Sequence, residues 1–409
     1  MLAGLAIGAT LGIAAHVTLG DAPALETAVR IVEPVGTIFL RLLFMLVVPL
    51  VLSALALGVA GLGDMRRLGR IGLRTLAYTV AVSTCAVLIG VGLVNAIRPG
   101  DGIPPALRAR LAERAHTAPV ATPPKAAMGA DFFVNLVPAN PVRAMADGDM
   151  LAVMTFALFL GVGLVLTQTE PARRLEEGLQ GLYDVTMRLL ALVIRMAPLG
   201  IACLVFSLTA RLGFDVMRQL GAYVVVVLLG LAIQQFGVYS ATVYWLGGMS
   251  PRAFFRGVRE AMLTAFSTAS SNATLPTALR VAEQELHLPP HVSRFVLTIG
   301  STANQNGTAL FEGVTVLFLA QFYGVELDVG QQLTIVVVCI LGGIGTAGVP
   351  GGSLPVIAMI LGMIGVPVEG IGMILGLDRF LDMCRTTLNV TGDLAAAVVV
   401  SRGEPQPSR

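Results

Sequence analysis

The chain has 409 residues, of which 55% are hydrophobic and 13% are charged. This composition is too apolar for a water-soluble domain, so it excludes that class of protein. The formal net charge is only +2, and the basic residues are spread over short loops instead of forming one basic domain, which argues against nucleic-acid binding.

Hydrophobic runs long enough to cross about 30 Å of hydrocarbon as helices occupy the first 250 residues. The predicted spans are 1–20, 35–63, 75–97, 131–167, 185–209 and 218–247. The first run lacks a basic start and a small-residue cleavage site, so we interpret it as a span and not as a signal peptide. The four cysteines lie in apolar segments without paired spacing, and we expect them to be packing residues.

The part from 261 to 400 is less regular, because clusters of Ser, Asn, Thr, Gly and Pro interrupt its apolar runs. Broken backbone at membrane depth is tolerated only where it lines a cavity or is buried in protein. We therefore expect two re-entrant hairpins, 261–289 with its tip at 270–276 and 341–366 with its tip at 345–352. Their tips would approach each other from opposite faces, as in inverted repeats; two kinked spans are the alternative.

Arginine placement predicts the orientation of the chain. Basic residues gather in loops that share one side if both hairpins enter and leave by the same face, and the positive-inside rule makes that side the cytoplasm. This predicts a multi-pass protein of the cell (inner) membrane with both termini cytoplasmic. The loop 98–130 also carries basic residues although it must lie outside; its Pro-rich, mixed-charge composition is typical of a long linker.

The last predicted span carries a polar stripe. Its residues recur at steps of four, three, four and four, which places them on one helix face: Asp378, Asp382, Arg385, Asn389 and Asp393. Charges in hydrocarbon are costly unless they are paired or face a wet cavity, so the stripe must face the protein interior. The alternative is a structural pair of Asp382 with Arg385 that only holds helices together.

The chemistry of the stripe suggests its ligands. The guanidinium of Arg385 is a planar fork for a carboxylate, and Asp382 is a natural partner for an ammonium group. Together they describe an amino acid with an acidic side chain, whose second carboxylate could meet the first tip near Ser270 and Ser271. Asn304, Asn389 and Asp393 offer hard oxygen ligands for a small cation.

Four motifs follow one another in the second half of the chain: Ser-Ser-Asn-Ala-Thr-Leu-Pro at 270–276, Asn-Gln-Asn-Gly-Thr-Ala-Leu at 304–310, Gly-Thr-Ala-Gly-Val-Pro-Gly at 345–351, and the stripe segments 378–386 and 389–393. In this order they resemble the dicarboxylate/amino acid:cation symporters, which include the excitatory amino-acid transporters and their prokaryotic glutamate and aspartate homologues. Weaker similarity before residue 250 extends the resemblance to essentially the whole chain.

The resemblance implies an all-α integral membrane fold of the elevator-type glutamate transporters, with eight transmembrane helices plus two re-entrant helical hairpins, assembled as a homotrimer. It divides the chain into a fixed scaffold, 1–74 and 98–217 including the extracellular linker, a moving transport domain, 75–97 and 218–400, and a cytoplasmic tail, 401–409.

The resemblance also assigns roles to residues. Arg385 would bind the substrate's side-chain carboxylate and Asp382 its ammonium group, while the rest of the substrate would meet Thr308, Thr386, Asn389, Ser270 and Ser271. The second tip, with Gly351, would be the gate. A sodium ion would bind at Gly300, Asn304, Asn389 and Asp393. Glu312 occupies the position of a proton-carrying glutamate; a paired carboxylate in a bundle is the other interpretation.

Two departures from the family pattern affect coupling. Asn306 stands where sodium-coupled relatives have an aspartate, and the third span offers only Thr79, Val82 and Ser83 around it, so we expect one sodium site to be disabled. Gln305 replaces a methionine, which weakens the case for a further cation site at Thr302.

We therefore expect a secondary active transporter of glutamate or aspartate, coupled to protons or to fewer sodium ions than its relatives, with no cofactor besides H+ and/or Na+. The alternatives are a C4-dicarboxylate symporter, a fully sodium-coupled amino-acid symporter, and an anion channel. An enzyme is not expected, because no Ser/His/Asp set, metal-ligand spacing or phosphate loop appears. The expected partners are the acidic amino acid, the lipid bilayer and two further copies of the chain.

Overall fold

The computed structural model describes residues 2–20, 23–61, 70–101, 137–147, 150–167, 169–213, 215–345 and 353–404. These residues form helices joined by turns, and none of them lies in a strand. Helices satisfy their own backbone N–H and C=O groups, which is what an apolar chain in hydrocarbon requires. The predicted all-helical fold is confirmed.

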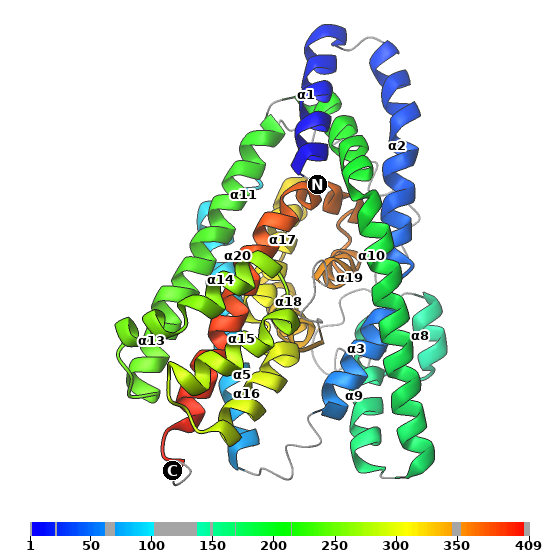
Figure 1. Cartoon of the computed structure of the whole chain (residues 1–409). Coiled ribbons are helices and arrows are strands. Elements are labelled where there is room, and N and C mark those ends of the chain that lie inside the picture. Colours follow the sequence, from blue (N-terminus) through cyan, green and yellow to red (C-terminus); the bar gives the residue numbers. More distant parts are fainter. Residues whose placement is uncertain are drawn as a thin grey trace.

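One group of helices comes from the first half of the chain and lies on the right in Figure 1. α10 is its axis, because α1, α2 and α3 all pack along it and α9 packs against α3. The members of this group are α1 (Leu2–Leu19), α2 (Pro23–Phe44), α3 (Val47–Gly61), α8 (Pro141–Asp147), α9 (Met150–Leu166) and α10 (Glu170–Leu212).

Two helices of this group extend beyond the predicted hydrophobic runs. α10 has 43 residues and begins at Glu170, whereas the predicted span begins at 185. Its first turns are polar, so hydropathy misses them, but Thr169 caps them by accepting a hydrogen bond from the backbone N–H of Ala172 at 3.4 Å. α2 begins at Pro23, before the predicted run 35–63. That run is divided at Met45 and Leu46 between α2 and α3.

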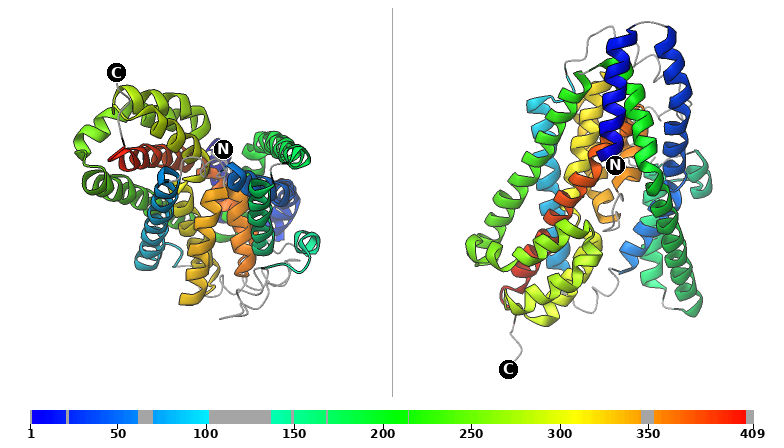
Figure 2. Two further views of the ribbon diagram at one scale, coloured as in Figure 1. Left: turned by 90° about the horizontal axis from the view of Figure 1, so that it is seen from below. Right: turned by 45° about the horizontal axis from the view of Figure 1, so that its top comes forward.

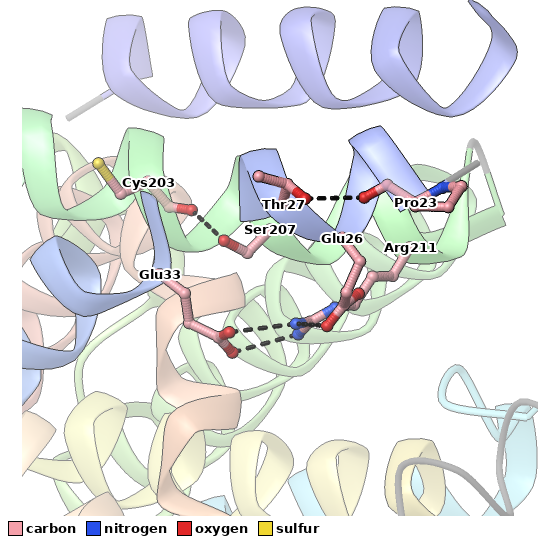
Figure 3. Close-up of polar contacts among 7 residues, drawn as sticks. All are labelled: Pro23, Glu26, Thr27, Glu33, Cys203, Ser207 and Arg211. Carbon is pink, nitrogen blue, oxygen red and sulfur yellow. Dashed lines mark hydrogen bonds and ion pairs between the residues drawn. The ribbon is translucent and has the colours of Figure 1, made fainter. Parts of the chain in front are cut away.

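An ion-pair cluster ties α2 to α10 (Figure 3). The two Nη atoms of Arg211 each lie 3.1 Å from an oxygen of Glu33, and Nη2 also lies 3.4 Å from Glu26. On the α1 side, a ring nitrogen of His16 lies 2.9 Å from the carbonyl oxygen of Ala210, the residue before Arg211. The end of α10 is therefore fastened to both α1 and α2.

The second group of helices contains α5 (Arg70–Ile97) and the helices that follow α10. A continuous helical column runs from 215 to 246 and includes two π-helical stretches: α11 (Asp215–Ala232), η2 (Ile233–Val238), α12 (Tyr239–Ala241) and η3 (Thr242–Leu246). The rest of the group is α13 (Pro251–Gly257), α14 (Arg259–Thr268), α15 (Ser271–Gln284), α16 (Pro290–Ala303), α17 (Asn306–Tyr323), α18 (Val329–Gly345), α19 (Ser353–Met363), η4 (Val368–Gly370) and α20 (Ile371–Ser401).

α20 and α17 form the centre of this second group. α20 packs against α11, α14, α16 and α17 within the group, and against α1 and α10 across the boundary. Every residue of α17 except Gln321 is buried. Figure 2 shows the two groups side by side, with α20 inside the second one.

By length and apolarity, two helices of the described residues qualify as membrane spans, Arg70–Ile97 and Val216–Leu246. A third is added if Glu170–Val193 and Arg195–Arg211, which meet at a bend of 52°, are counted as one span. Shorter apolar helices cover Ala3–Leu19, Val48–Ala60, Ala152–Leu166 and Val329–Gly343. The predicted number of eight spans therefore stays a prediction, since breaks and short helices prevent a count by length alone.

The first predicted hairpin has its chain reversal where α14 meets α15. Ala269 has a φ of 50°, and Ser270 begins the next helix as its N-cap. The reversal thus falls at the start of the predicted tip, and residues 272–276 lie in α15. Both arms pack against α20. In the second hairpin α18 packs against α19, and the tip at 346–352 with Gly351 lies outside the described residues.

Candidate binding site

The site begins at a break in a buried helix. α16 ends at Ala303 and α17 starts at Asn306, while Asn304 and Gln305 between them have non-helical dihedrals, with ψ near 60°. A helix end in the interior leaves backbone groups that need partners. Asn389 supplies one, because its Oδ1 accepts a hydrogen bond from the N–H of Gly307 at 2.7 Å. The interruption predicted from the Asn-Gln-Asn-Gly sequence is present.

The polar stripe faces the interior, as predicted. The exposed fractions of its residues are 3% for Asp378, 5% for Asp382, 1% for Arg385, 2% for Asn389 and 3% for Asp393. The start of α17 lies directly against the stripe: a Cβ atom at Gly307 would be 2.8 Å from the carbonyl oxygen of Arg385. Only glycine permits this approach, so the broken helix and the stripe form one site.

Two carboxylates and one aromatic ring surround the guanidinium of Arg385. Nη2 lies 3.0 Å from Oδ1 of Asp378 and 3.0 Å from Oδ1 of Asp382, and Nε donates to the same Asp382 oxygen at 3.0 Å. The guanidinium carbon lies 4.1 Å from the ring centroid of Phe311, a cation–π contact. Sequence reasoning assigned no role to Asp378 or Phe311; the i to i+7 spacing of Asp378 and Arg385 was the available signal.

Two atoms of this cluster are buried without a hydrogen-bond partner among the described residues. They are Nη1 of Arg385, a donor, and Oδ2 of Asp382, an acceptor. A buried polar atom left without a partner is costly, so such atoms in a native site call for a ligand or water. One cationic donor and one anionic acceptor side by side are complementary to a carboxylate and an ammonium group.

The hydroxyl and amide residues predicted around the substrate lie close by. Nδ2 of Asn389 donates to Oγ1 of Thr308 at 3.2 Å and to Oε1 of Gln305 at 2.5 Å. Thr386, next to Arg385 in the chain, is buried. The structure thus joins Thr308 and Asn389 directly.

The hydroxyl groups of the two serines in the first hairpin differ in their hydrogen bonds. The hydroxyl of Ser270 accepts from the N–H of Ala273 at 3.3 Å, so it serves as a helix cap. Ser271 is 2% exposed, and its hydroxyl has no partner among the described residues. Ser271 is therefore the better candidate for a substrate contact.

The predicted cation ligands are brought together only in part. Nδ2 of Asn304 donates to Oδ1 of Asp393 at 2.8 Å, and a Cβ atom at Gly300 would lie 2.5 Å from that oxygen. Oδ1 of Asn304 has no partner in the described part of the chain. The side chain of Asn389 instead binds the start of α17, and Thr302 is exposed and donates to the carbonyl of Ile299 at 3.0 Å.

Comparisons with known proteins identify the family of this chain. The model of the Sodium:dicarboxylate symporter family matches residues 1–403. The chain belongs to the sodium:dicarboxylate symporter family. The resemblance inferred from the four motifs is confirmed, and the family is one of membrane transporters, not of enzymes.

Three relatives in this family illustrate its range. The chain is 34% identical over 405 residues to the proton/sodium-glutamate symport protein of Bacillus subtilis, covering 97% of this chain and 91% of the relative. It is 33% identical over 382 residues to the proton/glutamate-aspartate symporter of Escherichia coli, covering 92% and 86%. With excitatory amino acid transporter 2 of Rattus norvegicus it shares 32% identity over 436 residues, covering 93% and 74%.

Asn306, which we expected to depart from the family pattern, is hydrogen-bonded to neutral groups. Ser83 of α5 donates to its Oδ1 at 2.5 Å, and its Nδ2 donates to the hydroxyl of Tyr239 at 3.1 Å. Nearby, Gln234 donates to the carbonyl of Val82 at 3.2 Å. Sequence reasoning included Ser83 but missed Tyr239 and Gln234; the paired glutamines 234 and 235 in an apolar run were the available signal.

Glu312, which the resemblance led us to expect at a proton-carrying position, has no exposed surface. It lies against the second hairpin, because a Cβ atom at Gly342 of α18 would be 3.0 Å from its Oε2 and 2.7 Å from Cγ1 of Val356 in α19. The Glu312 carboxyl group thus meets the place where the two arms of that hairpin come together. Of the described residues, no three His, Cys, Asp or Glu side chains form a metal-binding group.

Proposed function

We propose that the chain is a secondary active transporter of acidic amino acids, glutamate or aspartate. One observation carries this proposal: Nη1 of Arg385 and Oδ2 of Asp382 are a donor and an acceptor in one buried cluster, and neither has a partner among the described residues. An acidic amino acid supplies both a carboxylate for the guanidinium and an ammonium group for the aspartate. A plain C4-dicarboxylate would leave the acceptor of Asp382 unpaired, which is costly in the interior.

The excess of buried carboxyl groups over buried cations supports ion coupling. The buried ionisable groups around the site are four carboxyl groups, Asp378, Asp382, Asp393 and Glu312, and one guanidinium, Arg385. An acidic amino acid adds one more net negative charge. Because unpaired charge in a low-dielectric interior is strongly unfavourable, cations or protons must enter with the substrate.

The coupling ions proposed are a proton at Glu312 and at most one sodium ion at Asn304 and Asp393, with Gly300 and Asn389 beside them. One relative is named a proton/sodium-glutamate symport protein and another a proton/glutamate-aspartate symporter. At Asn306 an amide replaces the charge that would offset the lost hydration of a second sodium ion, and its polar atoms are already engaged by Ser83 and Tyr239. This supports reduced sodium coupling.

The proposed mechanism is elevator-type alternating access in a homotrimer. Residues 1–74 and 98–217 would be the scaffold, 75–97 and 218–400 the transport domain, and 401–409 the tail. The segregation of the helices into two groups, with α10 and α1 touching α20 across the boundary, supports this division. In this proposal the second tip with Gly351 is the gate, and both termini are cytoplasmic in the inner membrane.

Uptake into proteoliposomes tests this function. The purified chain is reconstituted, sodium and proton gradients are imposed separately, and radiolabelled aspartate, glutamate and succinate are offered. We expect accumulation of an acidic amino acid driven mainly by an inward proton gradient, with succinate a weak substrate. Arg143→Ala, which breaks an exposed ion pair on α8, is the control that should match wild type. Accumulation of succinate in preference to both amino acids would contradict the proposal.

A further inference from the structure

Asp378 is the carboxylate of the stripe to which no ligand has been assigned. It is 3% exposed and lies two helical turns before Arg385 on the same face of α20. Its Oδ1 accepts from Nη2 of Arg385 at 3.0 Å. Since Asp382 already pairs with this guanidinium, charge neutralisation alone does not require a second buried carboxylate.

The contacts of Arg385 show what the second carboxylate does. Oδ1 of Asp382 meets both Nε and Nη2, so a single oxygen atom serves as the contact along that edge of the guanidinium. The guanidinium is bonded through Nε to a flexible aliphatic chain, and changes in the torsions of that chain can still swing it about this single oxygen contact. The bond from Nη2 to Asp378 adds a second point, and two points fix the in-plane direction of Nη1.

A separate set of groups restrains tilting of the guanidinium on one of its faces. Phe311 covers one face of the guanidinium, and Tyr223 of α11 packs against Phe311 with ring centroids 6.5 Å apart. Tyr223 is itself stacked on Phe318 at 4.7 Å and hydrogen-bonded to Thr315 at 2.8 Å. Phe311 therefore restrains the guanidinium on one face, and its swing about the Asp382 oxygen is the movement that Asp378 restrains.

We propose that Asp378 is a positioning residue that sets substrate chain length by fixing Nη1 of Arg385 at one distance from Oδ2 of Asp382. This inference rests on the proposed function. Aspartate and glutamate differ by one methylene between the ammonium-bearing carbon and the side-chain carboxylate. A site whose two charged contacts are held at one spacing fits one of them, and discrimination by a single methylene reaches roughly 10- to 200-fold.

Binding of aspartate and of glutamate to the full chain in lipid nanodiscs tests the inference, at one pH and one sodium concentration. The readout is the ratio of the two dissociation constants. Removing a negative charge beside Arg385 strengthens binding of both substrates alike, so the ratio cancels that effect and reports geometry. Asp378→Ala frees this swing and should change the ratio by more than about fivefold, towards equality.

Two further variants keep the inference falsifiable. Asp378→Asn retains an oxygen acceptor for Nη2 and should keep the wild-type ratio within about twofold, a rescue that a purely electrostatic role would not give. If Asp378→Ala does not fold, Asp378→Glu displaces the contact by one methylene and should also change the ratio more than about fivefold. Asp147→Ala, an exposed ion-paired aspartate on α8, is the matched control.

The outcomes separate the two proposals. Wild-type protein that binds neither amino acid overturns the proposed function. Wild-type protein that binds both equally, an Asp378→Ala or Asp378→Glu ratio within fivefold of wild type, or an Asp378→Asn ratio as altered as that of Asp378→Ala, overturns the positioning role while the transport proposal stands.

Discussion

Asn304, in the break between α16 and α17, donates its side-chain amide to Asp393 of α20 at 2.8 Å, and its own amide oxygen lies in the interior without a partner among the described residues. A carboxylate and an amide oxygen are hard ligands that suit a small hydrated cation. This pair is therefore the part of the predicted sodium site that the structure brings together.

Asp393→Asn should raise the sodium concentration that half-saturates substrate binding by at least about tenfold, because the only anionic ligand of the pair is lost. Titration of sodium against a fixed aspartate concentration measures the effect. Asp147→Asn on the exposed surface of α8 is the control. Unchanged sodium dependence would exclude Asp393 as a cation ligand.

Arg385→Ala should abolish uptake of acidic amino acids and also destabilise the protein. It removes the carboxylate fork and leaves Asp378 and Asp382 as buried charges without their partner, a change that typically costs about 3–5 kcal/mol. Arg385→Lys should recover little uptake, because a point charge cannot contact both aspartates and the substrate as the guanidinium does. Thermal unfolding and uptake are measured on the same preparations. Normal aspartate uptake by a folded Arg385→Ala variant would disprove the assignment.

Asp382→Ala should distinguish the ammonium group of the substrate from its carboxylates. The variant loses Oδ2, the acceptor that has no partner in the described part of the chain, so amino-acid binding should weaken by about tenfold or more, whereas succinate, which has no ammonium group, should be affected less. Competition of each compound against radiolabelled aspartate gives the comparison. Equal losses for both would show that Asp382 only positions Arg385.

Asn306→Asp should increase sodium dependence. The substitution restores a negative charge in a buried position where Ser83 can still donate to it, so a cation gains a compensating ligand. Uptake is measured as a function of sodium at constant pH. Asn95→Asp, on the exposed part of α5 where Asn95 donates to Gln332 at 2.7 Å, is the control. If both variants behave like wild type, the neutral amide is not what limits sodium coupling.

Glu312→Gln should make uptake independent of an imposed proton gradient. A carboxyl group that enters protonated and leaves deprotonated carries the proton, and the amide mimics only the protonated form. Wild-type uptake should rise when the outside is acidified, while the variant should exchange substrate across the membrane without concentrating it. Proton-driven accumulation that persists in Glu312→Gln would move the proton site elsewhere.

Features set by local sequence were predicted well. The steps of three and four between Asp378 and Asp393 place them on one face of any α-helix, and the cost of burying charge then decides that the face is interior. The break at Asn304 and Gln305 and the reversal beside Ser270 follow from residues that cap helices or interrupt them.

Features set by distant contacts do not follow from local patterns. Tyr239 meets Asn306 across 67 residues and was not predicted. Ser83, 223 residues from Asn306, was expected near it only because of the family resemblance. The start of α10 at Glu170 was not predicted, because hydropathy measures apolarity and not helix propensity. The first turns of α10 are stabilised by a cap and by neighbouring helices. Thr302, for which Gln305 already weakened the case, is exposed and donates to the carbonyl of Ile299 in its own helix.

Because the five polar residues of the stripe lie on one helix, α20, they reach the interior together or not at all. Advancing the helix by one residue turns it by about 100°, which would carry all five polar side chains out of the interior together. Two tight contacts fix the rotation of this rod: Gly300 against Asp393 and Gly307 against the backbone of Arg385. A methyl group at either glycine would displace the whole of α20. The affinity for the cation and the affinity for the substrate should therefore fall together, although glycine has no charged side chain.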